Sequence, residues 1–204
     1  MKPNQLPTHG PTAMNFVDEL NRTTEKIMVT TSGGIPIKLA RGFAAGIELM
    51  ERAGGDGNKL IFIGNGGSAA IASHQAIDYW KNGGLEALAF NDASLLTCIS
   101  NDFGYEKVFS EPIKRFARPG DVLLAISSSG RSPNILQGVE AARKLKCHVI
   151  TFSGFDESNP LRCAGDLNFY VPSHTYGIVE ISHLALIHAM LEDIMVSRAG
   201  LEKR

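Results

Sequence analysis

Two segments rich in glycine and serine have residue types suited to binding a phosphate group. The first is Gly64-Asn65-Gly66-Gly67-Ser68, and the second runs from Ser127 to Ser132 with the sequence SSSGRS. Hydroxyls and free backbone N–H groups beside a helix N-terminus can bind the oxygens of one phosphate without a lysine. Each segment alone also fits a tight turn into a helix, with Ser68 as the expected cap of the first helix. Together they predict an anion site.

Titratable residues lie at helical spacing in two later segments. His74 and Asp78 are four residues apart, so they share one face of the helix predicted after the first loop. Glu180 and His188 are eight residues apart on the last predicted helix, which places them about 80° apart around its axis. Two imidazoles and two carboxylates satisfy a four-coordinate metal site chemically. A histidine on a helix also serves structure alone, and a His–Asp pair can be a surface contact.

The elements that position these residues alternate between strands and helices. Short apolar runs predict five strands, at 59–64, 85–90, 122–127, 148–152 and 167–171. Helical periodicity predicts helices at 14–29, 36–52, 68–81, 105–116, 133–145 and 177–199. This order indicates an α/β fold: a doubly wound parallel five-stranded sheet with helices on both faces and an N-terminal helix pair. We expect a disordered leader at 1–12 and a single domain at 13–204, with the surplus helices available for an oligomer interface.

Composition excludes several classes of function. The net charge is −1, with no basic stripe for nucleic acid and no polybasic or long apolar segment for a membrane. Gly64 to Ala69 lacks the third glycine of a dinucleotide fingerprint, and no P-loop is present, so no nucleotide cofactor is expected. The three cysteines are widely spaced, which indicates reduced thiols and a cytoplasmic location.

Taken together, the motifs resemble the sugar isomerase (SIS) domain and, within it, the phosphoheptose isomerases. The resemblance covers residue 14 to the end of the chain. It includes the GNGGS loop with His74 six residues after Ser68, and the SNDFGY segment at 100–105. It also includes GDVLL at 120–124, the serine loop, and a final helix with His183 and His188 five residues apart.

The resemblance implies roles for the matching residues. Asn65 and Asp102 are expected to contact sugar hydroxyls, and Gly66 and Gly67 to bring backbone N–H groups to the substrate. The phosphate is assigned to the hydroxyls of Ser68, Ser127, Ser128, Ser129 and Ser132. In family members four positions gather in one pocket that can hold zinc; here they are His74, Asp78, Glu180 and His188.

Two of those four positions depart from the family pattern. The family usually has glutamate where this chain has Asp78, and glutamine where it has Glu180. Three consequences are open: a more anionic metal site, a base moved from one helix to the other, or a different substrate length. His183 is assigned a structural or supporting role.

The implied reaction is isomerisation through an enediol, converting sedoheptulose 7-phosphate to D-glycero-D-manno-heptose 7-phosphate for nucleotide-activated heptose. His188 and either Asp78 or Glu180 are the expected acid and base, one zinc ion is the expected cofactor, and a homotetramer with sites at subunit borders is the expected assembly. Two alternatives are another sugar phosphate as substrate, and a non-catalytic protein that binds sugar phosphate or the replication initiator. His188 favours the enzyme, because relatives that bind the initiator typically lose this histidine.

Overall fold

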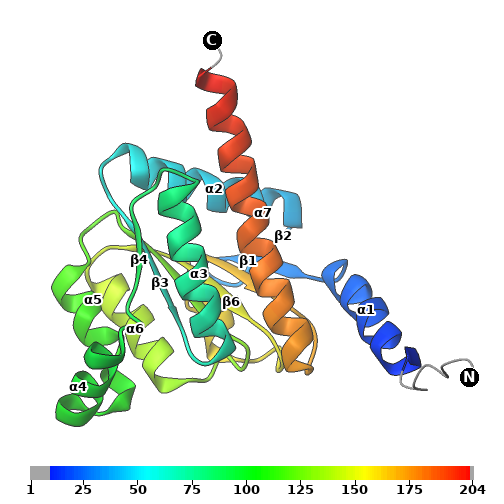
Figure 1. The fold of residues 1–204 in the computed structure, drawn as a ribbon, viewed down its shortest axis with the longest axis horizontal. Helices are drawn as coiled ribbons and strands as arrows, with labels where there is room; N and C mark the ends of the chain where they lie inside the picture. The colour runs from blue at the N-terminus through cyan, green and yellow to red at the C-terminus, as the bar shows by residue number, and fades with distance from the viewer. Residues whose placement is uncertain (1–9, 203–204) are drawn as a thin grey trace, which may run out of the picture.

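The computed structural model describes residues 10–202, and its centre is a seven-stranded sheet (Figure 1). The strand order is β2-β1-β7-β6-β5-β3-β4. The strands are β1 Met28–Thr31, β2 Pro36–Ile37, β3 Leu60–Gly64, β4 Ala87–Ala89, β5 Val122–Ser127, β6 His148–Ser153 and β7 Leu167–Tyr170. The helices are α1 Gly10–Thr24, α2 Leu39–Gly55, α3 Gly67–Lys81, α4 Ala93–Phe103, α5 Ser110–Phe116, α6 Pro133–Lys144 and α7 Tyr176–Glu202, with 3-10 turns η1 Tyr105–Lys107 and η2 Pro160–Cys163.

The five predicted parallel strands are all present and pair side by side from β7 to β4. In β3, Leu60 and Phe62 pack into the core on one face of the sheet, while Ile61 and Ile63 pack into the core on the other. Strands buried on both faces read as continuous apolar runs, which is why the sequence predicted them well. The α/β fold class is confirmed.

The predicted number of strands is wrong, because β1 and β2 extend the sheet to seven. Strand β1 pairs antiparallel with β7, and β2 pairs antiparallel with β1. Met28 and Val29, predicted as the end of the first helix, instead begin β1. Gly33 and Gly34 both have positive φ and turn the chain back into β2. The N-terminal helices α1 and α2 are therefore separated by a hairpin.

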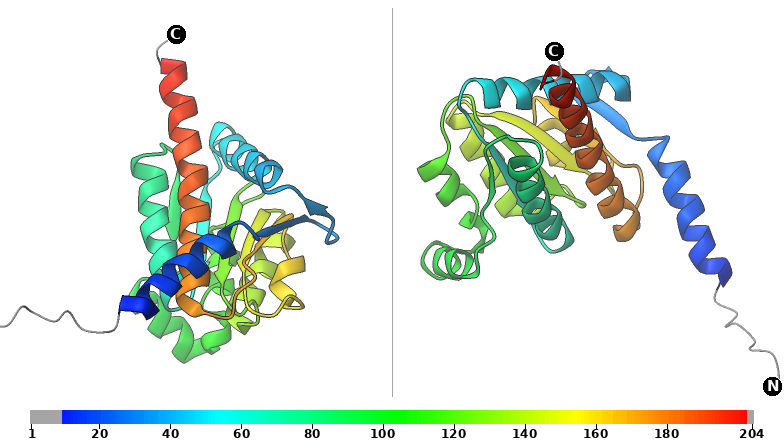
Figure 2. Two further views of the ribbon diagram at one scale, coloured as in Figure 1. Left: turned by 90° about the vertical axis from the view of Figure 1, so that its right-hand side faces the viewer. Right: turned by 45° about the horizontal axis from the view of Figure 1, so that its top comes forward.

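Two layers of helices cover the sheet. Helices α2, α3 and α7 bury one face, and α5 and α6 bury the other. Residues 10–12, predicted as part of the leader, are helical in α1; residues 1–9 lie outside the described part of the chain. Helix α1 extends away from the sheet and contacts the start of α7 (Figure 2). Within residues 10–202 no helix is both long and apolar enough to cross a membrane.

The strand order reverses between β3 and β5, because the chain leaves β3 for β4 on one side and returns to β5 on the other. Ligands of such sheets bind beyond the carboxyl ends of the strands at this reversal. The segments after β3 and β5 are the two predicted anion loops. The first leads into α3 and the second into α6, so the topology directs two helix N-termini toward one place.

Candidate substrate cavity and histidine cluster

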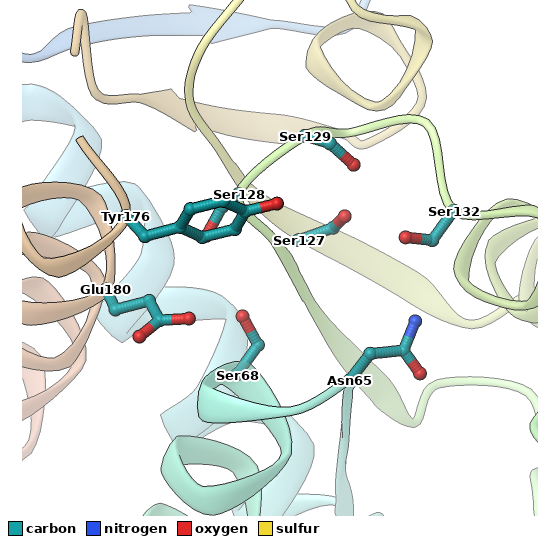
Figure 3. Close-up of a pocket in the computed structure, with 8 residues that line it drawn as sticks. All are labelled: Asn65, Ser68, Ser127, Ser128, Ser129, Ser132, Tyr176 and Glu180. Atoms are coloured by element: carbon teal, nitrogen blue, oxygen red, sulfur yellow. The ribbon is translucent and has the colours of Figure 1, made fainter. Parts of the chain in front are cut away.

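A cavity of about 130 Å³ lies where these two loops meet the first turn of α7 (Figure 3). We call it the serine cavity. It is lined by Asn65, Ser68, Ser127, Ser128, Ser129, Ser132, Tyr176 and Glu180. Every lining residue except Tyr176 is a predicted site residue. The lining is thus made of hydroxyls, an amide and one carboxylate, without a lysine or arginine.

The serine loop leaves hydroxyl groups available inside the cavity. Ser128 is buried, and its hydroxyl has no hydrogen-bond partner among the described residues. Ser132 is the N-cap residue of α6, but its hydroxyl makes no capping hydrogen bond. Ser127 Oγ accepts the N–H of Gly130 at 3.2 Å, and Ser129 Oγ accepts the N–H of Arg131 at 3.3 Å. A buried hydroxyl without a partner costs free energy unless a ligand or water completes it.

Arg131, the cation of the serine loop, pairs with a residue outside the cavity. Its Nη2 lies 2.8 Å from Oδ2 of Asp156. Hydrogen bonds from Ser158, together with the one from Arg131, lower the pKa of Asp156 to about 2. Arg131 is therefore paired with a carboxylate that is ionised at neutral pH, and the serine cavity relies on neutral donors.

The glycine loop begins α3 in a different way from the one the sequence predicted. Gly66, not Ser68, is the N-cap residue, with φ +55° and ψ −122°. The carbonyl of Gly66 accepts the N–H groups of Ala69 and Ala70 at 3.0 and 3.1 Å. Ser68 is instead the second residue of the helix and is buried. The first N–H groups of a helix have no acceptor within it, so those of Gly67 and Ser68 are available to an anion.

Gly67 packs directly against the carboxylate of Glu180. A Cβ atom added at Gly67 would lie 2.5 Å from Oε1 of Glu180. The absent side chain at position 67 is therefore what allows Glu180 to reach the N-terminus of α3 from α7. Figure 3 shows the Glu180 carboxylate beside Ser68 at the edge of the serine cavity.

Asn65 is oriented by two residues that the sequence analysis missed. Asn65 Nδ2 donates to Asn134 Oδ1 at 2.9 Å, and Asn134 Nδ2 donates to Asn65 Oδ1 at 2.8 Å. The hydroxyl of Tyr105 also donates to Asn65 Oδ1 at 3.2 Å. Asn134 follows Ser132-Pro133 directly, and this polar residue at the start of an otherwise amphipathic helix was the available signal.

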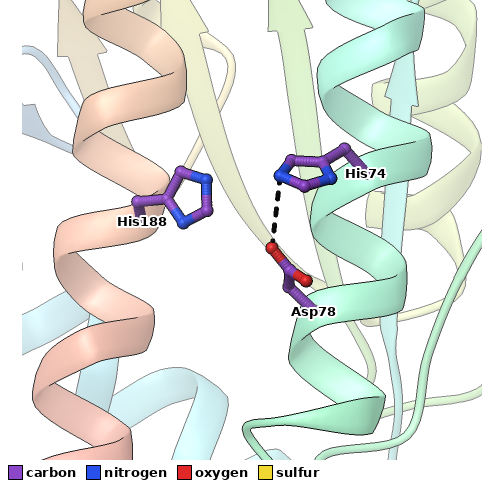
Figure 4. Close-up of side chains that lie close together, drawn as sticks. All are labelled: His74, Asp78 and His188. Carbon is purple, nitrogen blue, oxygen red and sulfur yellow. Dashed lines mark ion pairs between the residues drawn. The ribbon is translucent and has the colours of Figure 1, made fainter.

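The structure brings together three of the four predicted metal ligands, on the facing sides of α3 and α7 (Figure 4). His74 Nε2 lies 3.3 Å from Asp78 Oδ2, and the rings of His74 and His188 are 5.4 Å apart between centroids. One ligand atom from each residue lies within 4.8 Å of the others. We call these three residues the histidine cluster. Two imidazoles and one carboxylate match a catalytic zinc site with three protein ligands and an open position.

Glu180 is not part of the histidine cluster. It lies in the first turns of α7, eight residues before His188, and eight residues rise about 12 Å along a helix. Residues from the first turns of α3 and α7 line the serine cavity, and the residues of the histidine cluster come later in both helices. The two helices therefore run in parallel, with the cavity at one end and the cluster beyond it.

Asp102 does not line the serine cavity. It lies near the C-terminus of α4, where its carboxylate accepts a hydrogen bond from Asn101 Nδ2 at 2.8 Å. The neighbouring segment reaches the site through Tyr105 instead. The contact between Asp102 and a sugar hydroxyl stays a prediction.

Comparison with known proteins identifies the family. Residues 16–154 match the SIS domain family. The chain is 38% identical over 173 residues to a phosphoheptose isomerase of Geotalea daltonii, covering 82% of this chain and 89% of the relative. It is 43% identical over 143 residues to a phosphoheptose isomerase of Serratia proteamaculans, covering 67% and 73%.

The structure agrees with the sequences. A phosphoheptose isomerase structure from Neisseria gonorrhoeae matches with a TM-score of 0.79 and 32% identity, covering 92% of this chain and 99% of that one. This chain belongs to the phosphoheptose isomerase family of SIS domain proteins. The family confirms the resemblance drawn from the two loops and the last helix.

The remaining histidine of the phosphoheptose isomerase motif in α7 is buried. His183 is fully enclosed, and its Nε2 lies 3.1 Å from the carbonyl oxygen of Ser153 at the end of β6. Burial lowers the pKa of His183 to about 4, although the hydrogen bond to Ser153 opposes the shift. The imidazole is therefore neutral at physiological pH and joins α7 to the sheet.

Proposed function

We propose that this chain isomerises sedoheptulose 7-phosphate to D-glycero-D-manno-heptose 7-phosphate, in the synthesis of nucleotide-activated heptose. The observation that carries the proposal is the placement of the serine cavity and the histidine cluster along the same pair of parallel helices. The serine loop offers donors for a phosphate, while Glu180 at the cavity edge and the histidine cluster beyond it offer groups that act on a carbonyl. The names of the relatives support the same assignment.

The phosphate is assigned to the serine loop and the N-terminus of α6. The hydroxyl of Ser128 has no hydrogen-bond partner among the described residues, and the hydroxyl of Ser132 makes no capping hydrogen bond. The N-terminus of α6 adds partial positive charge. Ser68, Ser127 and Ser129 complete the set. Asn65, held by Asn134, is assigned to a sugar hydroxyl. Binding the phosphate at one end fixes the position of the reacting carbons at the other.

Zinc is the metal that we assign to the histidine cluster. His74, Asp78 and His188 would hold it, and the nitrogen and oxygen ligands suit its preference. When bound, the ion would polarise the substrate carbonyl. The shorter side chain of Asp78 is also fixed by its contact with His74, which leaves it poorly placed to reach the serine cavity.

Glu180 is the carboxylate that we assign as base. It lines the serine cavity, whereas Asp78 belongs to the histidine cluster. Glu180 removes a proton from C1 of the ketose, and the C–H electrons form the double bond of the enediol while the carbonyl oxygen gains a proton. Return of the proton to C2 and loss of the proton from the C1 hydroxyl give the aldose. His188 is assigned the exchange of the oxygen-bound protons, because an imidazole can both donate and accept a proton.

We also propose a homotetramer with sites at subunit borders and a cytoplasmic location. Large apolar side chains on the helices support the assembly: Ile77 is 50% exposed, Trp80 54% and Val196 70%. The three free cysteines support a reducing compartment.

The test is turnover of sedoheptulose 7-phosphate by purified protein, with chelator, with added zinc, and beside a His188→Ala variant. We expect turnover that falls with chelator, returns with zinc, and drops by about 10²–10⁴-fold in the variant. Normal turnover by His188→Ala would refute the catalytic role of the histidine. Binding of the sugar phosphate without turnover under every metal condition would refute the heptose isomerase assignment.

A further inference from the structure

Tyr176 is the residue of the serine cavity that the proposed function leaves unused. It is the first residue of α7, its side chain is 64% exposed, and it lines the cavity with the serines. Figure 3 shows the ring across the cavity, with the hydroxyl directed toward the serine loop. The hydroxyl makes no hydrogen bond to any described residue. An exposed tyrosine that points its hydroxyl into a polar cavity is placed to donate to a ligand.

Aromatic contacts hold the ring of Tyr176 in this orientation. Phe155, in the loop after β6, packs edge-to-face against it, with centroids 4.7 Å apart and planes at 88°. His174 stacks on the same phenylalanine with a centroid distance of 6.0 Å. Edge-to-face pairs of this kind stabilise one relative orientation of the two rings. Phe155 thus favours one orientation of a side chain that is otherwise largely exposed.

Phe155 is itself held in an unusual backbone conformation. Its φ is +57°, a value that a bulky residue rarely adopts. The N–H of Phe155 donates to the carbonyl of Ser173 at 3.0 Å, and its own carbonyl accepts the hydroxyl of Tyr170 at 2.7 Å. The preceding N–H, of Gly154, donates to the carbonyl of Ser128 at 3.0 Å. Strained conformations that the surroundings impose in this way cluster at functional sites.

We propose that Tyr176 is a phosphate-binding residue of the serine cavity and that Phe155 is the residue that positions it. The turn at Phe155 connects the backbone of Ser128 to the ring of Tyr176, so the serines and the tyrosine hydroxyl are held relative to one another. Because a phosphate is ionised, a hydrogen bond to it from the Tyr176 hydroxyl is charge-assisted and stronger than a bond between neutral groups. The proposal rests on the proposed function, in that it takes the ligand of the cavity to be a sugar phosphate.

The test is calorimetric binding of inorganic phosphate and of sedoheptulose 7-phosphate to the wild type and to Tyr176→Phe, which keeps the ring and removes the hydroxyl. We expect binding of both ligands to weaken about tenfold, the effect of losing one hydrogen bond to a charged group. Thr97→Val is the matched control, because the Thr97 hydroxyl bonds only to carbonyls of its own helix. An unchanged affinity for inorganic phosphate in Tyr176→Phe would overturn the proposal.

The positioning role of Phe155 is tested with Phe155→Leu, alone and combined with Tyr176→Phe. Alone, we expect it to weaken phosphate binding severalfold by releasing the tyrosine ring. In the Tyr176→Phe background it should add nothing, and an equal loss in both backgrounds would overturn the positioning role. Calorimetry reads binding without turnover. A wild type that binds phosphate but does not isomerise would therefore refute the isomerase assignment while still testing Tyr176.

Discussion

The serine cavity and the histidine cluster occupy the same pair of helices but are built differently. The cavity is formed by loops at the ends of strands, with buried hydroxyls, helix N-termini and a residue with positive φ. The cluster is formed by side chains on facing helix surfaces, and the side chain of His74 is 55% exposed. Binding of the phosphate thus depends on backbone geometry that many residues share. The reactive end depends on a few side chains, each of which one substitution can change.

The largest expected effect on turnover comes from substituting the two carboxylates one at a time: Glu180 in the serine cavity and Asp78 in the histidine cluster. Glu180→Gln should lower kcat by about 10²–10³-fold with little change in KM, because it removes the base while keeping the shape of the cavity. Asp78→Asn should lower zinc affinity instead, since it removes the charged ligand of the cluster. Steady-state kinetics and zinc titration measure the two effects.

The outcome of this pair decides which helix carries the base. Glu180→Gln also installs the residue that the family usually has at this position. Full activity in that variant, together with a loss of kcat in Asp78→Asn that zinc does not restore, would contradict our assignment and return the base to α3.

A smaller effect is expected at the phosphate end. Ser128→Ala should raise KM about tenfold and leave kcat nearly unchanged, because it removes a hydroxyl that binds the unreacting part of the substrate. Ser94→Ala, at an exposed position in the first turn of α4, is the matched control. A fall in kcat as large as the rise in KM would contradict the assignment of Ser128 to substrate binding alone.

The smallest effect on activity is expected from His183, which shares α7 with His188 but is buried. Its folded pKa of about 4 is below the ordinary value of 6.5, so between these values the unfolded chain binds more protons. Stability is therefore full above pH 6.5 and falls as the pH decreases toward 4, by about 2 kcal/mol between pH 7 and pH 5.

His183→Gln should reduce this loss, because glutamine can donate to Ser153 without titrating. Urea unfolding at pH 7 and pH 5 measures the difference, with turnover near the wild-type value at pH 7. An identical pH dependence of stability in the variant would show that His183 does not titrate as described.

The strands that are buried on both faces were the predictable part of the fold. β3 and β5 are continuous apolar runs of five and six residues, and their short length separates them from a buried helix. Strand β1 was missed because Met28 and Val29 continue the apolar spacing of the first predicted helix. They form a strand through pairing with β2 and β7, which the spacing of apolar residues does not show. Helix α4 was also missed. None of its residues is fully buried in the chain.

In the site, residue types were predictable and their grouping was not. The serines and Asn65 followed from motifs, and they line one cavity. Glu180 was expected beside His188, but the spacing of residues around a helix does not show how far along the helix they lie from each other. Tyr176 carries no motif and is recognised only by what its side chain contacts, whereas the polar start of α6 was a sequence signal for Asn134.

The contact between Gly67 and Glu180 makes the charge of the serine cavity depend on two positions in different elements. A side chain at position 67 would meet the carboxylate of Glu180 where it now lies, so the Glu180 side chain would have to move away from the N-terminus of α3. Evolution can alter the charge of the cavity directly by a single step in α7. A substitution at position 67 would change the same charge indirectly, by moving the Glu180 carboxylate out of the serine cavity.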